Sequence, residues 1–228
     1  MLFRQLFEKS SSTYTYLLAD PESQEGILID PVKETIERDL KLLKELNIAL
    51  KYILDTHVHA DHITSSSELK EKTGAQIVLG KATNVECADI LLADQEELKF
   101  GGLTIKAIAT PGHTNGCTSY LCESYLFSGD TLLIRGNGRT DFQEGSSETL
   151  FHSVREKLFT LPDSTIVFPG HNYDGHLMST IGEEKAHNPR LGLNKSFEEF
   201  KEIMENLNLA EPKKIDIAVP ANLKCGRN

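Results

Sequence analysis

The sequence predicts an α+β fold in which β-sheet packs under helices in more than one layer. Runs rich in β-branched and aromatic residues, bounded by turn residues, recur along the chain and outnumber the segments with helical periodicity. These strand-like and helix-like segments alternate, which favours sheet covered by helices. The 228 residues contain no linker-like change in composition, so we expect a single domain over residues 1–228.

In the first part of the chain, strands are expected at 14–19, 26–30 and 51–55. A helix is predicted between the last two, over 34–46, because its apolar residues recur at helical spacing. A second helix is predicted over 63–73, where Gly74 would end it, and a strand over 76–79 follows.

A block rich in strands is expected after residue 97. Its expected strands are 98–100 and 103–109, joined through Gly101-Gly102 as a hairpin, then 117–122, 125–127 and 165–168. A helix is predicted over 148–159 with Ser147 as its N-cap, and another over 197–206. We expect residues 196–228 to form a C-terminal helix and tail packed on the domain.

Composition excludes several classes of function. The chain carries 24 Lys and Arg against 34 Asp and Glu, so its formal net charge is −10. We therefore expect no binding to nucleic acid or to anionic membranes, and no apolar run approaches the roughly 18 residues of a spanning helix. The irregular spacing of four cysteines predicts free thiols in a reducing compartment, the cytoplasm, with an organelle-targeted form after removal of a transit peptide as the alternative: Cys87, Cys117, Cys122 and Cys225.

Five of the eight histidines lie in three short segments, and each segment directly follows a predicted strand. The first segment, 56–62, reads THVHADH, and the other two end in Pro-Gly-His. Asp130 follows the predicted strand 125–127 in the same way. The candidate ligands are His57, His59, Asp61, His62, His113, Asp130 and His171.

This arrangement predicts a metal centre. Strand ends that emerge at one edge of a sheet place their polar residues in a common crevice, and imidazole with carboxylate suits Zn or Fe. Because side chains at i and i+2 of a strand point to opposite faces, His57 and His59 can face one metal only if the chain has already turned. The isolated His152, His176 and His187 are expected to be hydrogen-bonded structural residues.

The order of these residues resembles the ligand set of the metallo-β-lactamase superfamily. Three later segments are similar to the persulfide dioxygenase (ethylmalonic encephalopathy protein-like) family: LLIRGNGRTDFQ at 132–143, NPRL at 188–191 and IAVPANLKCG at 217–226. The early segments YTYLL at 14–18 and IDP at 29–31 fit as well, so the resemblance spans nearly the whole chain. One departure is Asn172, where the family commonly has Asp.

The resemblance implies an αββα sandwich, in which two mixed sheets pack face to face and the metal site lies at one edge. It also implies an enzyme with one Fe(II) per subunit, held by His57, His113 and Asp130, that oxidises glutathione persulfide with O₂ to sulfite and glutathione in sulfide catabolism. The remaining polar groups would then orient the ligands and the substrate, or hold a second metal: His59, Asp61, His62 and His171. A homodimer is also implied.

Glutathione persulfide carries two carboxylates, so its site should present cationic and aromatic groups. The candidate contacts are Arg139 and Tyr173, followed by Asn222 and Lys224. The alternative for Arg139 is an ion pair with Asp141 that holds its loop together.

Two other functions remain open at the level of sequence. The first is a hydroxyacylglutathione hydrolase, similar to glyoxalase II, with a Zn or mixed two-metal centre that activates water. The chain leaves little room for the extra helical domain of those hydrolases. The second is a non-catalytic metal-binding or interaction protein that retains the fold.

Overall fold

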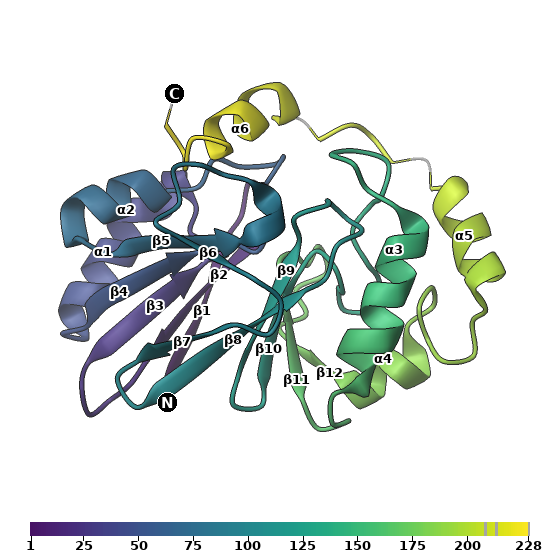
Figure 1. Cartoon of the computed structure of the whole chain (residues 1–228), viewed down its shortest axis with the longest axis horizontal. Coiled ribbons are helices and arrows are strands. Elements are labelled where there is room, and N and C mark those ends of the chain that lie inside the picture. The colour runs from purple at the N-terminus through teal and green to yellow at the C-terminus, as the bar shows by residue number, and fades with distance from the viewer. Residues whose placement is uncertain (208, 213, 228) are drawn as a thin grey trace.

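The structure is a computed structural model that describes residues 1–207, 209–212 and 214–227. Two six-stranded sheets pack against each other, and helices cover their outer faces (Figure 1). This is the predicted α+β fold with the αββα order of layers. The division into domains stays a prediction.

The first sheet contains the N-terminal strands in chain order. β1 to β3 are antiparallel neighbours, and β3 to β6 run parallel. The connections between the parallel strands β3, β4 and β5 contain α1 (Ile36–Glu45) and α2 (Ser66–Thr73), which lie on the same outer face (Figure 1). The strands are β1 (Leu2–Glu8), β2 (Thr13–Ala19), β3 (Glu25–Ile29), β4 (Ala49–Leu54), β5 (Gln76–Gly80) and β6 (Ile90–Leu92).

The second sheet has the order β12-β11-β10-β9-β8-β7, and only β10 and β11 pair in parallel. Its strands are β7 (Glu97–Phe100), β8 (Leu103–Ala109), β9 (Thr118–Cys122), β10 (Tyr125–Gly129), β11 (Ile166–Pro169) and β12 (Ser179–Thr180). The helices that follow its strands are α3 (Ser147–His152), α4 (Ile181–His187), α5 (Phe197–Glu205) and α6 (Ile215–Asn222).

The core lies between the two sheets, and a second apolar layer lies under the helices. Tyr16 and Ile29 of the first sheet share one buried cluster with Tyr120 and Phe127 of the second. All seven residues of β2 are buried because sheet covers one of its faces and α1 covers the other. The first-sheet residues facing α1 include Leu17, which lies in a separate buried cluster.

Several predicted helices begin or end at other residues in the structure. The predicted helix 148–159 is α3, which continues as a π-helical turn over Ser153–Lys157 and a 3₁₀ turn over Leu158–Thr160. The prediction of Ser147 as its N-cap is wrong: the side chain of Ser146 accepts the hydrogen bond from the Thr149 N–H. The predicted helix 63–73 begins only at Ser66, since the residues before it belong to the histidine segment.

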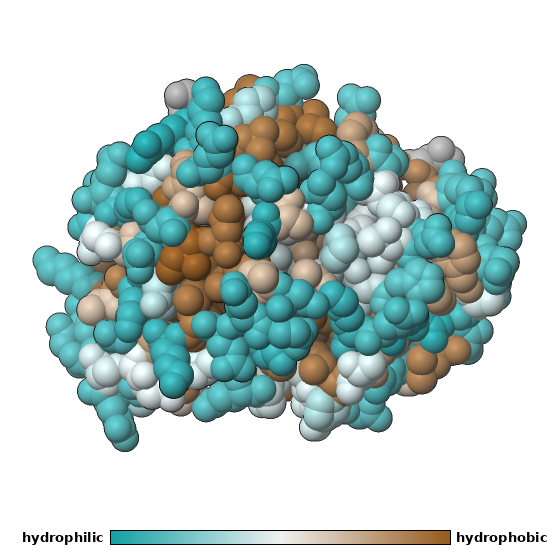
Figure 2. All heavy atoms as spheres, viewed as in Figure 1, coloured by the Kyte–Doolittle hydropathy of each residue, from teal (hydrophilic) through white to brown (hydrophobic). Residues whose placement is uncertain are grey.

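No sequence pattern described above predicts β1, β6, β12, α4 or α6. β12 has only two residues, and α6 carries Pro220 and little separation of apolar from polar faces. Hydrophobic side chains gather at the top of the face shown in Figure 2, where α6 lies, and Ile217 on this helix is 64% exposed. Among the described residues, no helix is long and apolar enough to cross a membrane.

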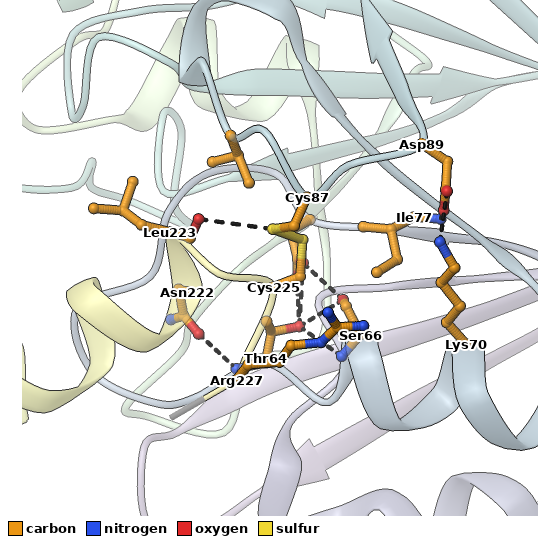
Figure 3. The surroundings of a disulfide bond; sticks show 12 residues. Thr64, Ser66, Lys70, Ile77, Cys87, Asp89, Asn222, Leu223, Cys225 and Arg227 are labelled. Atoms are coloured by element: carbon orange, nitrogen blue, oxygen red, sulfur yellow. Dashed lines mark hydrogen bonds and ion pairs between the residues drawn. A yellow bond between two sulfur atoms is a disulfide. The ribbon is translucent and has the colours of Figure 1, made fainter.

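A disulfide joins Cys87 to Cys225, 138 residues later in the chain (Figure 3). The prediction of four free thiols is therefore wrong for this pair, while Cys117 and Cys122 are free and buried. Spacing could not reveal the pair, because only the fold brings the two Cα atoms to 6.1 Å. The bond attaches the C-terminal segment to the connection between β5 and β6.

Replacement of Cys87 by Ser is expected to lower the free energy of unfolding by about 2–5 kcal/mol, because the unfolded chain gains the freedom of a long open loop. Thermal unfolding with and without a thiol reductant checks this result. Reductant should lower the Tm of the wild type and leave the Tm of C87S unchanged. Equal responses of the two proteins would contradict the bond.

Candidate metal centre

The predicted metal-binding segments all lie at one edge of the sandwich, directly after strands. The segment with His57 follows β4, His113 follows β8, Asp130 follows β10 and His171 follows β11. β4 ends at Leu54, so the chain has left the strand before it reaches His57, as the spacing required. The backbone N–H of Tyr14 donates to the carbonyl oxygen of Gly170 (2.8 Å), which joins β2 to the end of β11.

Three groups of possible ligands are preformed among the described residues, and one of them, Asp30, Asp55 and His59, is fully buried. One ligand atom each from His57, His113 and Asp130 lies within 4.8 Å of the other two. The same limit holds for His59, Asp61 and His62, which form a second group beside the first. The imidazole rings of His57 and His59 are 4.1 Å apart between centroids, so these two groups are contiguous.

Hydrogen bonds fix which nitrogen of His113 faces the site. Its Nδ1 lies 2.6 Å from the carbonyl oxygen of Arg139, which can only accept, so Nδ1 carries the proton. Nε2 is then free to bind a cation, and it lies 3.7 Å from Oδ2 of Asp130. This is the usual way in which a metal-binding histidine is oriented.

Burial and charge set the protonation of the group. Burial lowers the pKa of His57 well below its usual value, so its ring is neutral and can donate an electron pair. Burial alone would raise the pKa of Asp130, but the charge and hydrogen bond of His171, together with the charges of His113 and His57, lower it well below its usual value. Asp130 is therefore ionised and supplies an anionic ligand atom.

His171 lies between two carboxylates. Its Nδ1 is 2.6 Å from Oδ1 of Asp130 and its Nε2 is 2.9 Å from Oδ2 of Asp61. Burial alone would lower the pKa of His171, but these two carboxylates raise it well above its usual value. A protonated His171 donates to both carboxylates and fixes their positions.

The residues present fit a bound metal. Nδ1 of His59 and Nε2 of His62 are buried and have no hydrogen-bond partner within the described part of the chain. Nε2 of His59 donates to Oδ1 of Asp30 (3.1 Å), which leaves Nδ1 as the nitrogen that can face a cation. Buried nitrogens without partners are costly unless a cation occupies the site, so this donor set supports a metal cofactor.

The metal-binding edge opens into a cavity of about 490 Å³. The candidate ligands His57, His113 and Asp130 line it, together with Asp61 and His171. Further along, its wall is formed by the 133–139 loop, the segment after His171 and part of the C-terminal segment: Leu133–Arg139, Asn172, Tyr173, Asp174, Arg190, Leu209, Ala210 and Pro212.

Two of the predicted substrate contacts line this cavity. Arg139 forms the ion pair with Asp141 that was its alternative role, through bonds of 2.6 and 2.7 Å, and also donates to the carbonyl oxygen of Ala210 (2.7 Å). Arg139 thus holds the C-terminal wall of the cavity. Tyr173 is 74% exposed and its ring stacks beside His171, with 6.2 Å between centroids.

The other two predicted substrate contacts lie outside the cavity lining. Lys224 is exposed, and Asn222 is buried with 4% of its surface accessible. Asn172, which stands where Asp was expected, accepts hydrogen bonds from the N–H groups of Asp174 and His176. An Asp would accept the same two bonds, so this substitution leaves the turn intact.

Arg190 is a cavity residue that the sequence analysis did not single out. Its guanidinium donates to the carbonyl oxygen of Asn137 (3.2 Å) and forms no ion pair with the residues that the structure describes. It lies in the NPRL segment that contributed to the resemblance, and that segment was the only signal for it.

Comparisons with known proteins agree with this geometry. The model of the family described as the Metallo-beta-lactamase superfamily matches residues 11–171. The mitochondrial persulfide dioxygenase ETHE1 of Mus musculus is 50% identical over 229 residues, which span 99% of this chain and 89% of the relative. The chain belongs to the persulfide dioxygenase family. As a member of that family, it is an oxygenase enzyme with a metallo-β-lactamase fold.

Two further relatives allow the persulfide dioxygenase and hydrolase families to be compared with this chain. The crystal structure of ETHE1 from Myxococcus xanthus has a TM-score of 0.97 and 52% sequence identity, with all of both chains covered. The hydroxyacylglutathione hydrolase of Pelagibacter ubique is 35% identical over 173 residues, which span 74% of this chain and 70% of that relative. The hydrolase matches less of the chain and at lower identity.

Replacement of Gly112 by Ala is expected to destabilise the protein by about 2–5 kcal/mol and to displace His113. Gly112 has a φ of +139°, and an added Cβ would lie 2.3 Å from Cα of Leu150. Chemical unfolding and metal content measure the two effects.

Gly74→Ala is the matched control, since Gly74 has a φ of +77° but no atom within 4 Å of an added Cβ. It should cost about 1 kcal/mol and leave metal content unchanged. Equal losses of unfolding free energy in the two variants would contradict the close contact with Leu150.

Proposed function

We propose that this protein is a persulfide dioxygenase with one Fe(II), which oxidises glutathione persulfide with O₂ and water to sulfite and glutathione. The observation that carries the proposal is the 50% identity to ETHE1 over nearly the full chain, together with the grouping of two imidazoles and one carboxylate at the sheet edge. The persulfide S–S bond breaks, the outer sulfur is oxidised, and the inner sulfur leaves as the glutathione thiol.

The proposed ligands are His57, His113 and Asp130. Two histidines and one carboxylate on one side of a metal leave its other positions open, an arrangement typical of non-haem Fe(II) oxygenases. Bound Fe(II) would supply electrons and open positions for O₂ and the persulfide sulfur. The chain itself holds the ligand atoms in place through the bonds of His113 to Arg139 and of Asp130 to His171.

In this proposal His59, Asp61, His62 and His171 orient the ligands rather than bind a second metal. His171 restrains Asp130 and Asp61 together, and Asp61 accepts from Nδ1 of His62 (2.9 Å). Such a chain of bonds limits the rotation of each carboxylate and imidazole.

The cavity contains cationic groups for a substrate with two carboxylates. Arg190 lines this space, and the Arg139 guanidinium lies over the ring of Phe142 (4.3 Å to the centroid). We infer that Arg190 binds a carboxylate of glutathione, that Arg139 shapes the wall beside it, and that Tyr173 contacts the substrate at the mouth. Asn222 and Lys224 have no such position in the cavity lining.

A glyoxalase II-like hydrolase with two metals is the second candidate. The observation that favours it is the pair of buried nitrogens without partners on His59 and His62, which a second metal would satisfy. Against it stands the lower identity to the hydroxyacylglutathione hydrolase, 35% over part of the chain.

Two further predictions concern the setting of the enzyme. A cytoplasmic location stays a prediction, since the mammalian relatives are named as mitochondrial. A homodimer also stays a prediction.

Replacement of Asp130 by Ala is expected to remove bound iron and O₂ consumption together, because the only carboxylate of the proposed ligand set is lost. Wild-type protein should contain about one iron per chain and consume O₂ with glutathione persulfide. His152→Ala is the control, because His152 is paired with Glu156 away from the cavity (2.7 Å). Two metals per chain and hydrolysis of lactoylglutathione by the wild type would favour the hydrolase instead.

Replacement of Arg190 by Gln is expected to raise KM for glutathione persulfide by about 10–100-fold, since a hydrogen bond to a charged group contributes about 1.5–3 kcal/mol. The value of kcat should change by less than about threefold. Arg155→Gln is the matched control: Arg155 is a partly buried arginine that donates to Gly192 (2.9 Å) and lies outside the cavity. A KM unchanged by R190Q would contradict this role.

A further inference from the structure

We propose that Asn222 is a positioning residue that holds the backbone of the histidine segment, residues 57–64, in the conformation the metal centre needs. This inference rests on the metal centre of the proposed function. It assigns to Asn222 a role that differs from the substrate contact expected from the sequence.

Both N–H donors and the oxygen of the Asn222 side-chain amide bind this segment. Its Nδ2 donates to the carbonyl oxygen of His59 (2.9 Å) and to that of His62 (2.8 Å). Its Oδ1 accepts from the backbone N–H of Thr64 (2.9 Å). One amide therefore binds the segment at three points, and the side chain is buried.

These three contacts matter because the segment between β4 and α2 lacks regular secondary structure over 57–62. Among the described residues, no backbone N–H donates to the carbonyl oxygens of His59 and His62, and buried backbone groups need partners. The two carbonyls that Asn222 binds belong to histidines whose rings lie 4.3 Å apart at the site. Fixing both carbonyls limits the directions in which those rings, and Asp61 between them, can point.

Asn222 is itself held firmly, although it comes from 158 residues beyond Thr64. It is the last residue of α6, and Figure 3 shows its side chain directed at Thr64. Three residues later, the carbonyl oxygen of Cys225 accepts from the N–H of Ser67 (3.0 Å), and Cys225 is bonded to Cys87. The C-terminal segment is thus fixed in place by the disulfide and restrains the backbone of the histidine segment.

The chemistry of the amide gives a specific test. Asn222→Asp keeps the shape of the side chain and the acceptor for Thr64, but it replaces the donor by an oxygen that faces two carbonyl oxygens. We expect N222D to bind Fe(II) about 10–100-fold more weakly than the wild type under anaerobic competition with a chelator. The absorption bands of the Co(II)-loaded protein should change as well, because they report ligand geometry.

Ala221→Gly is the matched control on the same helix. Ala221 is buried and has no side-chain polar group, so A221G should lower Tm through α6 while it leaves the three hydrogen bonds in place. We expect A221G to bind Fe(II) as the wild type does. Asn222→Ala, which removes the amide without adding a charge, serves if N222D does not fold.

The outcomes separate the two proposals. Wild-type Fe(II) affinity in both N222D and N222A would overturn the positioning role, and so would an equal loss in A221G at a matched Tm. If the wild type and D130A bind Fe(II) equally weakly, the proposed metal centre fails, and the inference about Asn222 falls with it. Weak binding by the Asn222 variants alone, with folded protein by circular dichroism, is the result that we expect.

Discussion

The site depends on one buried carboxylate, that of Asp30 at the end of β3. It accepts hydrogen bonds from the backbone N–H of Thr56 (2.7 Å), from the Thr56 hydroxyl (3.0 Å) and from Nε2 of His59 (3.1 Å). A carboxylate that is 1% exposed needs such partners, because an unpaired buried charge is strongly destabilising. Asp30 therefore binds the start of the histidine segment to the first sheet. Asn222 binds its end to α6.

The second sheet supplies the other half of the site by a different means. His113, Asp130 and His171 each follow a strand of that sheet, and they are restrained by the carbonyl of Arg139 and by the bonds between His171 and the two carboxylates. The candidate metal ligands thus meet where the two sheets meet. Their spacing follows from how the sheets pack, which the buried cluster around Tyr16 and Phe127 fixes.

Much of this arrangement could be predicted from the sequence, because local patterns determine it. A strand followed by His or Asp at a turn specifies both the strand and the edge at which the side chain emerges, and this was sufficient for His57, His113, Asp130 and His171. Contacts between distant segments have no local pattern. The Cys87–Cys225 bond, the cavity position of Arg190 and the burial of Asn222 all depend on where the C-terminal half returns, and α6 gave only a weak helical signal.

The disulfide also turns part of the chain into a covalent ring. His113, Asp130 and His171 all lie between Cys87 and Cys225, whereas His57 lies outside. A protease that cuts the backbone once inside this ring releases no separate fragment while the bond is intact, so these three residues stay attached to the segment that carries His57. The enzyme can thus be nicked once in its second half and still keep all the groups of its site on one molecule.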